Sequence, residues 1–420
     1  MKKIKDLCHD AKNASRSLAI VDSTKKNRFL SILADWLREN QDCILSENAL
    51  DIADGKAGGL TDALVDRLTL TPARINGIAN DLQHLITLPD PVGEMFEQST
   101  NQQGLKIKKQ RVPLGVLAVI YESRPNVTID VAALAIKSGN AIVLRGGKET
   151  IRSNQVLVNG IHRALEQAGL PKHAVQFISD PDRSHVENLL RMHNMIDMLI
   201  PRGGAGLHRY CRENSSIPVI TGGIGICHLF VDESADPMRS IEVIRNAKIQ
   251  RPTVCNALDT ILVHTSIAHD FVPALVKSLR KDGVSFRLDS DAMKVLQNQD
   301  DPVVSPAGRD DFDTEWLSLV LGIRVVDGVD QAIAHIAAHS THHSDGILTQ
   351  NVENAEKFTT LVDSAAVYVN ASTRFTDGSQ LGLGAEVAIS TQRLHARGPM
   401  ALRELTTYKW VIAGEYHTRA

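Results

Sequence analysis

The sequence predicts an α/β protein in which parallel sheets are covered by helices on both faces. Its 420 residues, 43% of them hydrophobic, are enough for two or three domains of ordinary size. From Val112 onward, short apolar runs alternate with helical stretches, and this βα repetition is typical of parallel sheets. Residues 1–100 instead have the apolar spacing of amphipathic helices.

Two helices are predicted within the N-terminal part. The first begins near residue 23, where Ser23 and Thr24 are candidate N-caps. Its apolar face consists of Phe29, Leu33, Trp36 and Leu37. The second follows Thr71, because Thr71 is a suitable N-cap and Pro72 fits the first helical position. Its apolar face consists of Ile75, Ile78, Leu82 and Leu85.

An exposed ribbon is predicted next, followed by the βα repetition. Leu105, Ile107 and Val112 are separated by Lys, Gln and Arg, which favours a ribbon and suggests an oligomer contact. Strands are then expected at LGVLAVIY, AIVLR, VQFIS, DMLIP and ICHLFVD. The helices between them are expected near 128–138, 151–168 and 184–193. A second αβ region extends from about Asn246 to Asn370.

The charge of the chain argues against binding to nucleic acid or to a membrane. Lys and Arg number 46 against 49 Asp and Glu, the formal charge is -3, and the pI is near 6.6. The basic stretch from Lys106 to Arg111 is too brief to form a basic patch. No apolar run approaches the roughly 20 residues of a spanning helix. We therefore expect a soluble, cytoplasmic protein that binds neither nucleic acid nor membranes.

The cysteines and histidines give little support for a metal site. The five cysteines lie far apart and form no CxxC pair, which argues against disulfides and against a cysteine-rich zinc site. In HIAAHSTHH, His335 and His339 have the i, i+4 spacing of a zinc-binding helix, whereas His342 and His343 follow it. Ile336 stands where a zinc hydrolase needs glutamate. We expect a solvated helix end and no metal.

Two glycine-containing turns are candidates for phosphate binding. PRGGAGLHR follows an apolar strand and precedes a helix, so Gly203, Gly204 and Gly206 would let backbone N–H groups approach a phosphate. A tight βα turn explains the same glycines equally well. LRGGKET is similar to a P-loop, but Ile142 stands where that motif needs glycine. A nucleotide kinase therefore loses its main support.

Cys255 lies between a predicted loop and the apolar strand DTILVH. Most single cysteines are small buried apolar residues. As a nucleophile, Cys255 would attack a carbonyl group whose oxygen needs hydrogen-bond donors, such as an Asn amide and a backbone N–H. The local sequence leaves both interpretations open.

Over nearly its whole length, the chain resembles the γ-glutamyl phosphate reductase family, a branch of the aldehyde dehydrogenase superfamily. The most specific stretches are VPLGVLAVIYESRPNVTIDV, SGNAIVLRGGKET, MLIPRGGAGLHRYCRE, IPVITGGIGICHLFVDES, NAKIQRPTVCNALDT, AVYVNASTRFTDGSQLGLGAEVAIS and LHARGPMALRELTTYKW. The resemblance implies an aldehyde dehydrogenase-like α/β fold. It also implies NADPH-dependent reduction of L-glutamyl 5-phosphate to L-glutamate 5-semialdehyde and phosphate, the second step of proline biosynthesis.

The resemblance assigns catalytic roles to two residues. Cys255 becomes the nucleophile that displaces phosphate and holds the acyl group as a thioester. Asn126, in RPNVT, matches the superfamily asparagine that stabilises the oxyanion together with the backbone N–H of Cys255. A turn residue after Pro125 is the alternative for Asn126.

The cofactor-binding residues follow in the same way. Arg145 matches a superfamily lysine on the adenine ribose, and Lys148 stands where NAD-preferring members carry glutamate, so the two cations suit the 2′-phosphate of NADP(H). Gly203, Gly204 and Gly206 would face the cofactor pyrophosphate. Glu315 matches a glutamate that contacts the nicotinamide ribose, with a surface acid as the alternative.

Substrate-binding candidates are Arg124 and the loop residues Ser372, Thr373 and Arg374. A guanidinium there would bind the free α-carboxylate of the substrate in two parallel hydrogen bonds, although many loop arginines are solvated. We expect a homo-oligomer, and association with glutamate 5-kinase stays open. The expected domains are an NADP-binding domain (1–100 and 113–223), a catalytic domain (224–403) and oligomerisation elements (101–112 and 404–414).

Three other functions remain to be distinguished. An ordinary aldehyde dehydrogenase and a CoA-acylating relative would also form a cysteine thioester, whereas a scaffolding protein on the same fold would have lost the chemistry. Hydrolytic members carry a glutamate two residues before the paired glycines that here are Gly222 and Gly223, and this chain has Ile220 there. The thioester is therefore expected to need phosphate rather than water as its acceptor in the oxidative direction.

Overall fold

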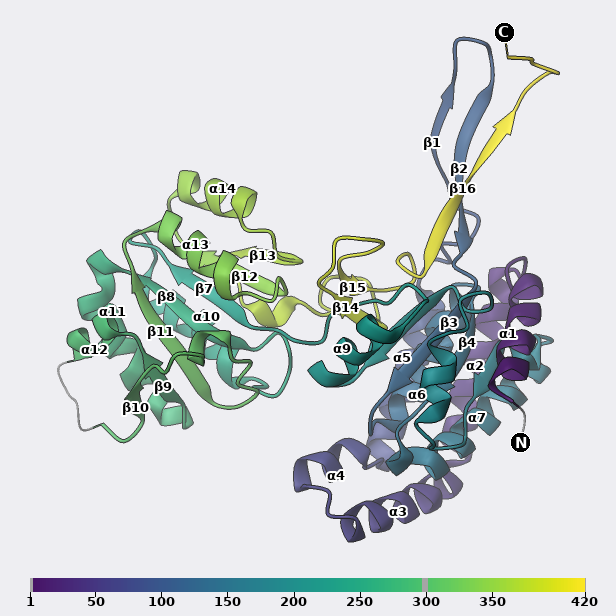
Figure 1. The fold of residues 1–420 in the computed structure, drawn as a ribbon, viewed down its shortest axis with the longest axis horizontal. Helices are drawn as coiled ribbons and strands as arrows, with labels where there is room; N and C mark the ends of the chain where they lie inside the picture. The colour runs from purple at the N-terminus through teal and green to yellow at the C-terminus, as the bar shows by residue number, and fades with distance from the viewer. Residues whose placement is uncertain (1–2, 297–300, 420) are drawn as a thin grey trace. The chain divides into compact units, whose positions relative to one another are not determined.

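The computed structural model describes residues 3–296 and 301–419, and the chain divides into two compact units. Unit 1 comprises the described parts of 1–221, 382–388 and 400–420, and unit 2 comprises the described parts of 222–381 and 389–399. Figure 1 shows the elements of each unit. The segments 382–388 and 400–403 thus group with unit 1, whereas the sequence placed them with the catalytic part. The roles expected for the two parts stay predictions.

The N-terminal part of unit 1 is helical. Its helices are α1 (Ile4–Leu18), α2 (Ser23–Glu39), α3 (Gln41–Ala57), α4 (Asp62–Leu68) and α5 (Pro72–Thr87). As predicted, Thr71 caps α5 and accepts a hydrogen bond from the Arg74 N–H. The cap of α2 is Asp22, which accepts from the Lys25 N–H at 2.9 Å, so the expectation of Ser23 or Thr24 was wrong. Asp22 is the last residue with extended backbone, and this is what an N-cap requires.

A four-stranded parallel sheet forms the centre of unit 1. Its strands are β3 (Val116–Tyr121), β4 (Ala141–Arg145), β5 (Val175–Phe177) and β6 (Met198–Arg202), in the order β5-β4-β3-β6. Helices α6 (Pro125–Lys137) and α7 (Ile151–Gln167) contact β3, β4 and β5 and are themselves contacted by α2. Helices α1, α8 (Ser184–Leu189) and α9 (Ala205–Asn214) contribute to a second apolar core with alternate residues of β3 and β4. After β3 the chain adds β4 and then β5 on one side of β3, and it later adds β6 on the other side. The strand order therefore reverses between β3 and β6.

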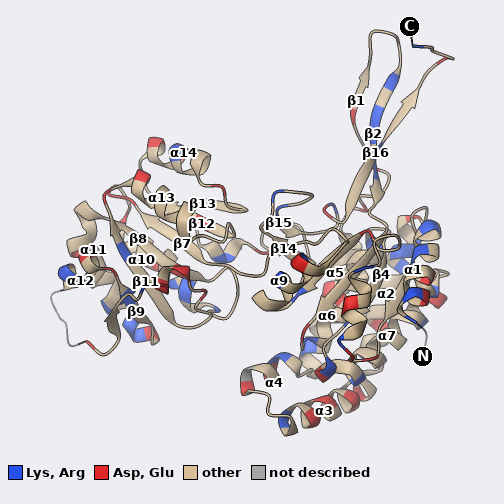
Figure 2. Ribbon diagram, in the orientation of Figure 1, with Lys and Arg blue, Asp and Glu red and all other residues tan. Residues whose placement is uncertain are grey.

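An antiparallel ribbon belongs to the same unit. It pairs β2 (Lys106–Pro113) with β1 (Met95–Thr100) on one side and β16 (Thr406–Ala413) on the other. Figure 2 shows the basic residues along β2, and the Lys109 ammonium lies 4.5 Å from the Tyr408 ring centre and 4.9 Å from that of Trp410. The strand β1 was not predicted, because its polar sequence EQST lacks apolar alternation.

Unit 2 contains a seven-stranded parallel sheet in the order β10-β9-β11-β8-β7-β12-β13. The strands are β7 (Cys227–Val231), β8 (Leu258–His264), β9 (Ser285–Leu288), β10 (Val304–Pro306), β11 (Val320–Val326), β12 (Ser344–Leu348) and β13 (Ala366–Val369). The helices are α10 (Pro237–Ile249), α11 (Thr265–Leu279), α12 (Ser290–Leu296), α13 (Val329–His339) and α14 (Val352–Leu361). One apolar core includes residues of α10, α11 and α12, and a separate core includes residues of α13 and α14, so helices cover both faces of the sheet. The strand ICHLFVD is β7 of this sheet and not a continuation of the first.

The strands β14 (Ala388–Ser390) and β15 (Gly398–Met400) form a further two-stranded sheet. Within the described residues, none of the helices is both long and apolar enough to cross a membrane.

Candidate active site

Cys255 lies in unit 2, in a turn just before β8, three residues before the first residue of that strand. It is half-buried, whereas Cys8, Cys211 and Cys227 are buried and Cys43 is exposed. Burial raises the pKa of Cys8 to about 12 and that of Cys211 to about 11. Because the thiolate is the reactive form, these two buried thiols are poor nucleophiles. The turn is at the amino end of the parallel strands, opposite to the edge where α/β sheets most often bind ligands.

The segment before β7 supports the Cys255 turn from one side. A Cβ atom at Gly225 would overlap the carbonyl oxygen of Cys255, so only glycine allows this approach. The Cys227 thiol donates to the same carbonyl oxygen at 3.3 Å. Glu315 in turn accepts a hydrogen bond from the Gly225 N–H at 2.8 Å, and burial raises the pKa of its carboxyl group. Glu315 therefore has a structural contact close to Cys255.

The loop after β13 supports the turn from the other side. The Thr373 hydroxyl donates to the Asn256 carbonyl at 2.8 Å, and the Asn256 amide donates to the Thr376 carbonyl at 2.9 Å. Ser372 and Thr373 are buried, and the Ser372 hydroxyl accepts from the Arg374 N–H. These two hydroxyl groups therefore hold the loop in place.

The Arg374 guanidinium is half-buried, and its Nε donates to the Gln250 side chain at 3.0 Å. Burial lowers the pKa of Arg374, and the positive charge of Arg251 lowers it further. A thiolate at Cys255 would raise the pKa of Arg374. The structure thus brings the Arg374 guanidinium within electrostatic range of Cys255 and of Arg251.

A buried ion pair underlies the start of β8. The Lys248 ammonium donates to the Leu258 carbonyl at 2.7 Å and lies 3.4 Å from the Asp259 carboxylate. Burial raises the pKa of Asp259 to about 6 although Lys248 opposes this. The Asp259 carboxylate also accepts a hydrogen bond from the backbone N–H of Trp316, the residue after Glu315. The pair connects α10, β8 and the Glu315 segment.

The glycine turn of unit 1 lies where the sequence predicted it, between β6 and α9. Gly204 is the N-cap of α9, and a Cβ atom at Gly204 or Gly206 would meet open space. The Gly204 N–H donates to the Glu122 carboxylate at 3.1 Å. The turn therefore holds a negatively charged group at a helix N-terminus.

The two basic cofactor candidates lie at the end of β4. Arg145 is held in place, because its guanidinium donates to the carbonyls of Gly146 at 2.9 Å and Pro181 at 2.8 Å. Burial lowers the pKa of Arg145. Lys148 follows in a short 3-10 helix and is exposed.

Asn126 is the second residue of α6, and Arg124 is the exposed N-cap of that helix. The Asn126 amide donates to the Asp130 carboxyl group at 3.0 Å. Burial raises the pKa of Asp130 to about 7, the hydrogen bond from Asn126 and the charge of Arg202 lower it, and Asp81 raises it. Asn126 thus belongs to unit 1 and Cys255 to unit 2.

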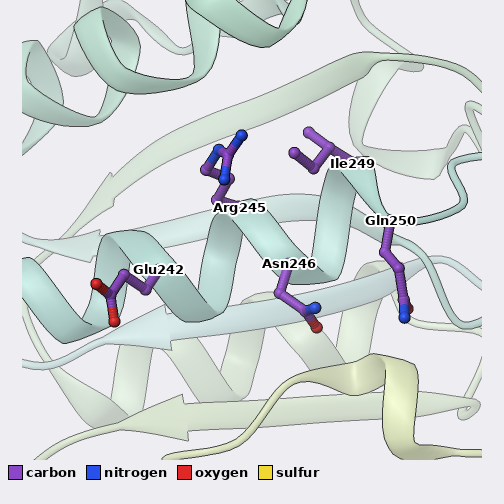
Figure 3. Close-up of a pocket in the computed structure, with 5 residues that line it drawn as sticks. All are labelled: Glu242, Arg245, Asn246, Ile249 and Gln250. Carbon is purple, nitrogen blue, oxygen red and sulfur yellow. The ribbon is translucent and has the colours of Figure 1, made fainter.

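A shallow hollow of about 290 Å³ lies along α10 (Figure 3). Figure 3 shows Arg245 and Ile249 pointing away from Asn246 and Gln250, so the lining side chains do not converge on one point. Gln250 connects the hollow to Arg374. We assign no chemistry to it.

Two of the four histidines of HIAAHSTHH, His335 and His343, are buried, whereas His339 is half-buried and His342 is exposed. His335 is 4% exposed, its ring lies 4.4 Å from that of His339 between centres, and Arg324 donates to its Nδ1 at 3.1 Å. Burial lowers the pKa of His335 to about 2. The expectation of a solvated helix end was therefore wrong for His335. Among residues 3–296 and 301–419, no three His, Cys, Asp or Glu side chains are arranged to hold a metal ion.

Gly225, Asn256, Gln250 and Glu122 were missed by the sequence analysis. Glycine close to the start of a strand signals close backbone approach, so Gly225, two residues before β7, was detectable in principle. The others act through partners that are distant in sequence, such as Arg374 for Gln250.

Comparisons with a family model and with known protein sequences point to the same protein family. A model of the aldehyde dehydrogenase family matches residues 1–295. The chain is 55% identical over 410 residues to the γ-glutamyl phosphate reductase of Escherichia fergusonii, with 98% of each chain covered. It is 56% identical over 405 residues to that of Serratia marcescens, covering 96% of this chain and 97% of the relative.

Solved structures agree. The crystal structure of γ-glutamyl phosphate reductase from Thermotoga maritima matches with a TM-score of 0.97 and 45% identity over 100% of both chains. An acetylating aldehyde dehydrogenase from Geobacillus thermoglucosidasius has a TM-score of 0.71 at 17% identity, covering 99% of this chain and 97% of that one, which shows the shared fold alone. The fold expected from the sequence is thereby confirmed. The chain belongs to the aldehyde dehydrogenase family and, within it, to the γ-glutamyl phosphate reductases.

Proposed function

We propose that this protein reduces L-glutamyl 5-phosphate to L-glutamate 5-semialdehyde and phosphate, with NADPH as the reductant, in the second step of proline biosynthesis. The names of relatives at 55% identity support the reaction, and the observation that carries the chemistry is the half-buried Cys255 in a turn held from two sides. The Cys255 sulfur attacks the acyl carbon, a C–S bond forms, and the C–O bond to phosphate breaks. When bound, NADPH supplies the hydride that reduces the resulting thioester, and the C–S bond breaks to release the aldehyde.

The oxyanion formed at the acyl carbon needs hydrogen-bond donors. The backbone N–H of Cys255 is one candidate, and the Asn126 amide is the other. Asp130 accepts one amide hydrogen of Asn126 and thereby fixes the side chain, leaving the second hydrogen for an oxyanion.

The cofactor site is proposed at the carboxyl ends of β3, β4 and β6. A carboxylate already lies on the Gly204 N–H, and open space surrounds Gly204 and Gly206, so the turn fits a phosphate group. Arg145 and Lys148 at the end of β4 would hold the 2′-phosphate. The contact of Glu315 with Gly225 is compatible with a role near the ribose of the nicotinamide.

Arg374 is the proposed ligand of the substrate carboxylate, because its guanidinium is half-buried and close enough to Cys255 for their charges to interact. Ser372 and Thr373 support it by fixing the loop, and their direct contacts with the substrate stay a prediction. Arg124 remains a second candidate. We also propose a cytoplasmic homo-oligomer that associates through the ribbon and, as an open point, with glutamate 5-kinase.

Ile220 supports this reaction over ordinary aldehyde oxidation. It occupies the position of the hydrolytic glutamate and is 2% exposed, so no carboxylate acts from there. Loss of a general base typically slows the dependent step by about 10²–10⁴-fold. The Cys255 thioester therefore survives until phosphate or hydride reaches it.

The test is oxidation of glutamate semialdehyde by NADP with and without phosphate. We expect steady formation of NADPH only with phosphate or arsenate, and without them at most a burst equal to the number of active sites. Sustained formation of free glutamate without phosphate would instead support the ordinary aldehyde dehydrogenase. Dependence on CoA would support the CoA-acylating alternative.

A further inference from the structure

Glu122 lies at the point of unit 1 where the strand order reverses. It is the first residue after β3, and its N–H donates to the Arg202 carbonyl at the end of β6 at 3.1 Å. In parallel α/β sheets, ligands bind in the crevice at this reversal, outside the carboxyl ends of the strands. The Glu122 side chain is therefore fixed at its base beside the proposed cofactor turn.

The Glu122 carboxylate occupies the turn itself. One oxygen accepts from the Gly204 N–H at 3.1 Å, and a Cβ atom at Gly203 would come within 2.7 and 2.8 Å of the two oxygens. The glycine at position 203 thus leaves the space in which the carboxylate lies. The N-terminus of α9 carries a partial positive charge that favours one negatively charged group.

A phosphate group and the Glu122 carboxylate cannot accept the same Gly204 hydrogen bond or share the same space. We propose that Glu122 is a built-in competitor of the cofactor phosphates at the N-terminus of α9, and that cofactor binding displaces it. The inference rests on the proposed function, because it assumes that the cofactor pyrophosphate binds at this turn.

The surroundings of Glu122 allow the displacement. Its side chain is exposed, and in the part of the chain that the structure describes the Gly204 contact is the one hydrogen bond of its carboxylate. Without cofactor, this contact gives the Gly204 N–H at the N-terminus of α9 a hydrogen-bond acceptor. It also disfavours small anions such as free phosphate, which offer a single group, relative to a dinucleotide that makes further contacts.

The experiment compares NADPH binding by fluorescence titration of the full chain in four forms. Glu122→Gln removes the charge, but its side-chain oxygen can still accept the Gly204 hydrogen bond, so the fold is retained. Glu213→Gln is the matched control, because Glu213 is exposed near the C-terminal end of the same helix. Gly204→Ala tests the site itself, because its new methyl group would point into open space that the cofactor is proposed to fill.

We expect Glu122→Gln to lower the Kd for NADPH by about 5- to 20-fold, since a like charge is removed next to the bound phosphate. In the same variant, inorganic phosphate should compete with NADPH at lower concentration than in the natural protein. Glu213→Gln should stay within about twofold of the natural Kd because exposed charges at that distance are largely screened. Gly204→Ala should weaken NADPH binding.

Two outcomes overturn the proposal, and they differ in what else they affect. If Glu122→Gln binds NADPH equally or more weakly while Gly204→Ala weakens binding, Glu122 is not a competitor, and the cofactor site still stands. If neither variant changes the Kd, the cofactor does not bind at this turn, and that part of the proposed function fails as well.

Discussion

Two cysteines of this protein differ in their surroundings and therefore in their roles. Cys227 and Cys255 belong to neighbouring segments, yet the Cys227 thiol is fully buried and donates to the Cys255 carbonyl, whereas Cys255 is half-buried in a turn. Burial holds the pKa of Cys227 far above its ordinary value. One cysteine therefore supports the backbone, whereas the other is more exposed, as the proposed nucleophile needs to be.

Replacing Cys255 by Ala should lower turnover by at least about a thousandfold, because covalent capture of the acyl group has no substitute. NADPH binding should persist, as measured by fluorescence titration. Cys43→Ser is the control, since Cys43 is exposed and takes no part in the proposed chemistry. Iodoacetamide should label both cysteines, and substrate should protect Cys255 alone. Substantial activity in Cys255→Ala would exclude the thioester.

Asp130→Asn should change how stability depends on pH. The folded pKa of Asp130 is raised by burial to about 7, above its ordinary value, so between about pH 4 and pH 7 the folded state binds more protons than the unfolded state. Stability contributed by this group therefore falls as the pH rises through that window. The neutral amide has no such cost, so the difference in Tm between Asp130→Asn and the natural protein should be more positive at pH 8 than at pH 5.

The measurement is thermal unfolding at pH 5 and pH 8, and also near pH 3 for the control Asp22→Asn, because hydrogen bonding to backbone N–H groups lowers the pKa of Asp22. In that variant, the loss of stability should be larger at pH 8 than near pH 3. A difference for Asp130→Asn that is the same at pH 5 and pH 8 would show that its pKa is not raised.

At the scale of elements, predictions succeeded where signals were local. Thr71 and Pro72 specify the start of α5 without reference to other parts of the chain. Ser23 and Thr24 failed as caps because three consecutive residues can cap α2, and the backbone path before the helix selects Asp22. Cys255 was identified through the family resemblance, whereas Glu122 escaped because its partner, Gly204, is remote in sequence.

The packing of α2 against α7 gives a prediction at this scale. A Cβ atom at Gly160 in α7 would overlap the Trp36 ring of α2, so Gly160→Ala should destabilise unit 1 by about 1–3 kcal/mol through overpacking. In a Trp36→Leu background the overlap is relieved. There, Gly160→Ala should be neutral or stabilising, because Ala favours helices over Gly by about 1 kcal/mol. The check is a double-mutant cycle of urea unfolding midpoints, and additive effects would contradict the proposed overlap.

At the scale of the whole molecule, unit 1 is built from segments that are far apart in the chain. Residues 400–419 belong to it although the whole of unit 2 precedes them in the chain, and β16 completes the ribbon. The outer strand of that ribbon leaves Trp410 56% exposed and Ile412 59% exposed. Exposed apolar side chains on an edge strand are typical of surfaces that pair with another chain.

Trp410→Lys should therefore weaken self-association of the protein. In sedimentation experiments, the mass of the variant should shift toward the 45.9 kDa of one chain at concentrations where the natural protein is associated. Met238→Lys is the matched control, since Met238 is 74% exposed on α10 in unit 2. An unchanged mass distribution for Trp410→Lys would remove the ribbon from the interface.

The position of β16 also affects how the protein is made. Its residues 406–413 are synthesised after the whole of unit 2, so β2 cannot gain its second neighbour until unit 2 has been translated. A chain cut short by premature termination before residue 406 would retain the hairpin of β1 and β2 but expose the edge of β2. The unpaired backbone groups of β2 could then pair with another chain, so the truncated product would be prone to aggregate.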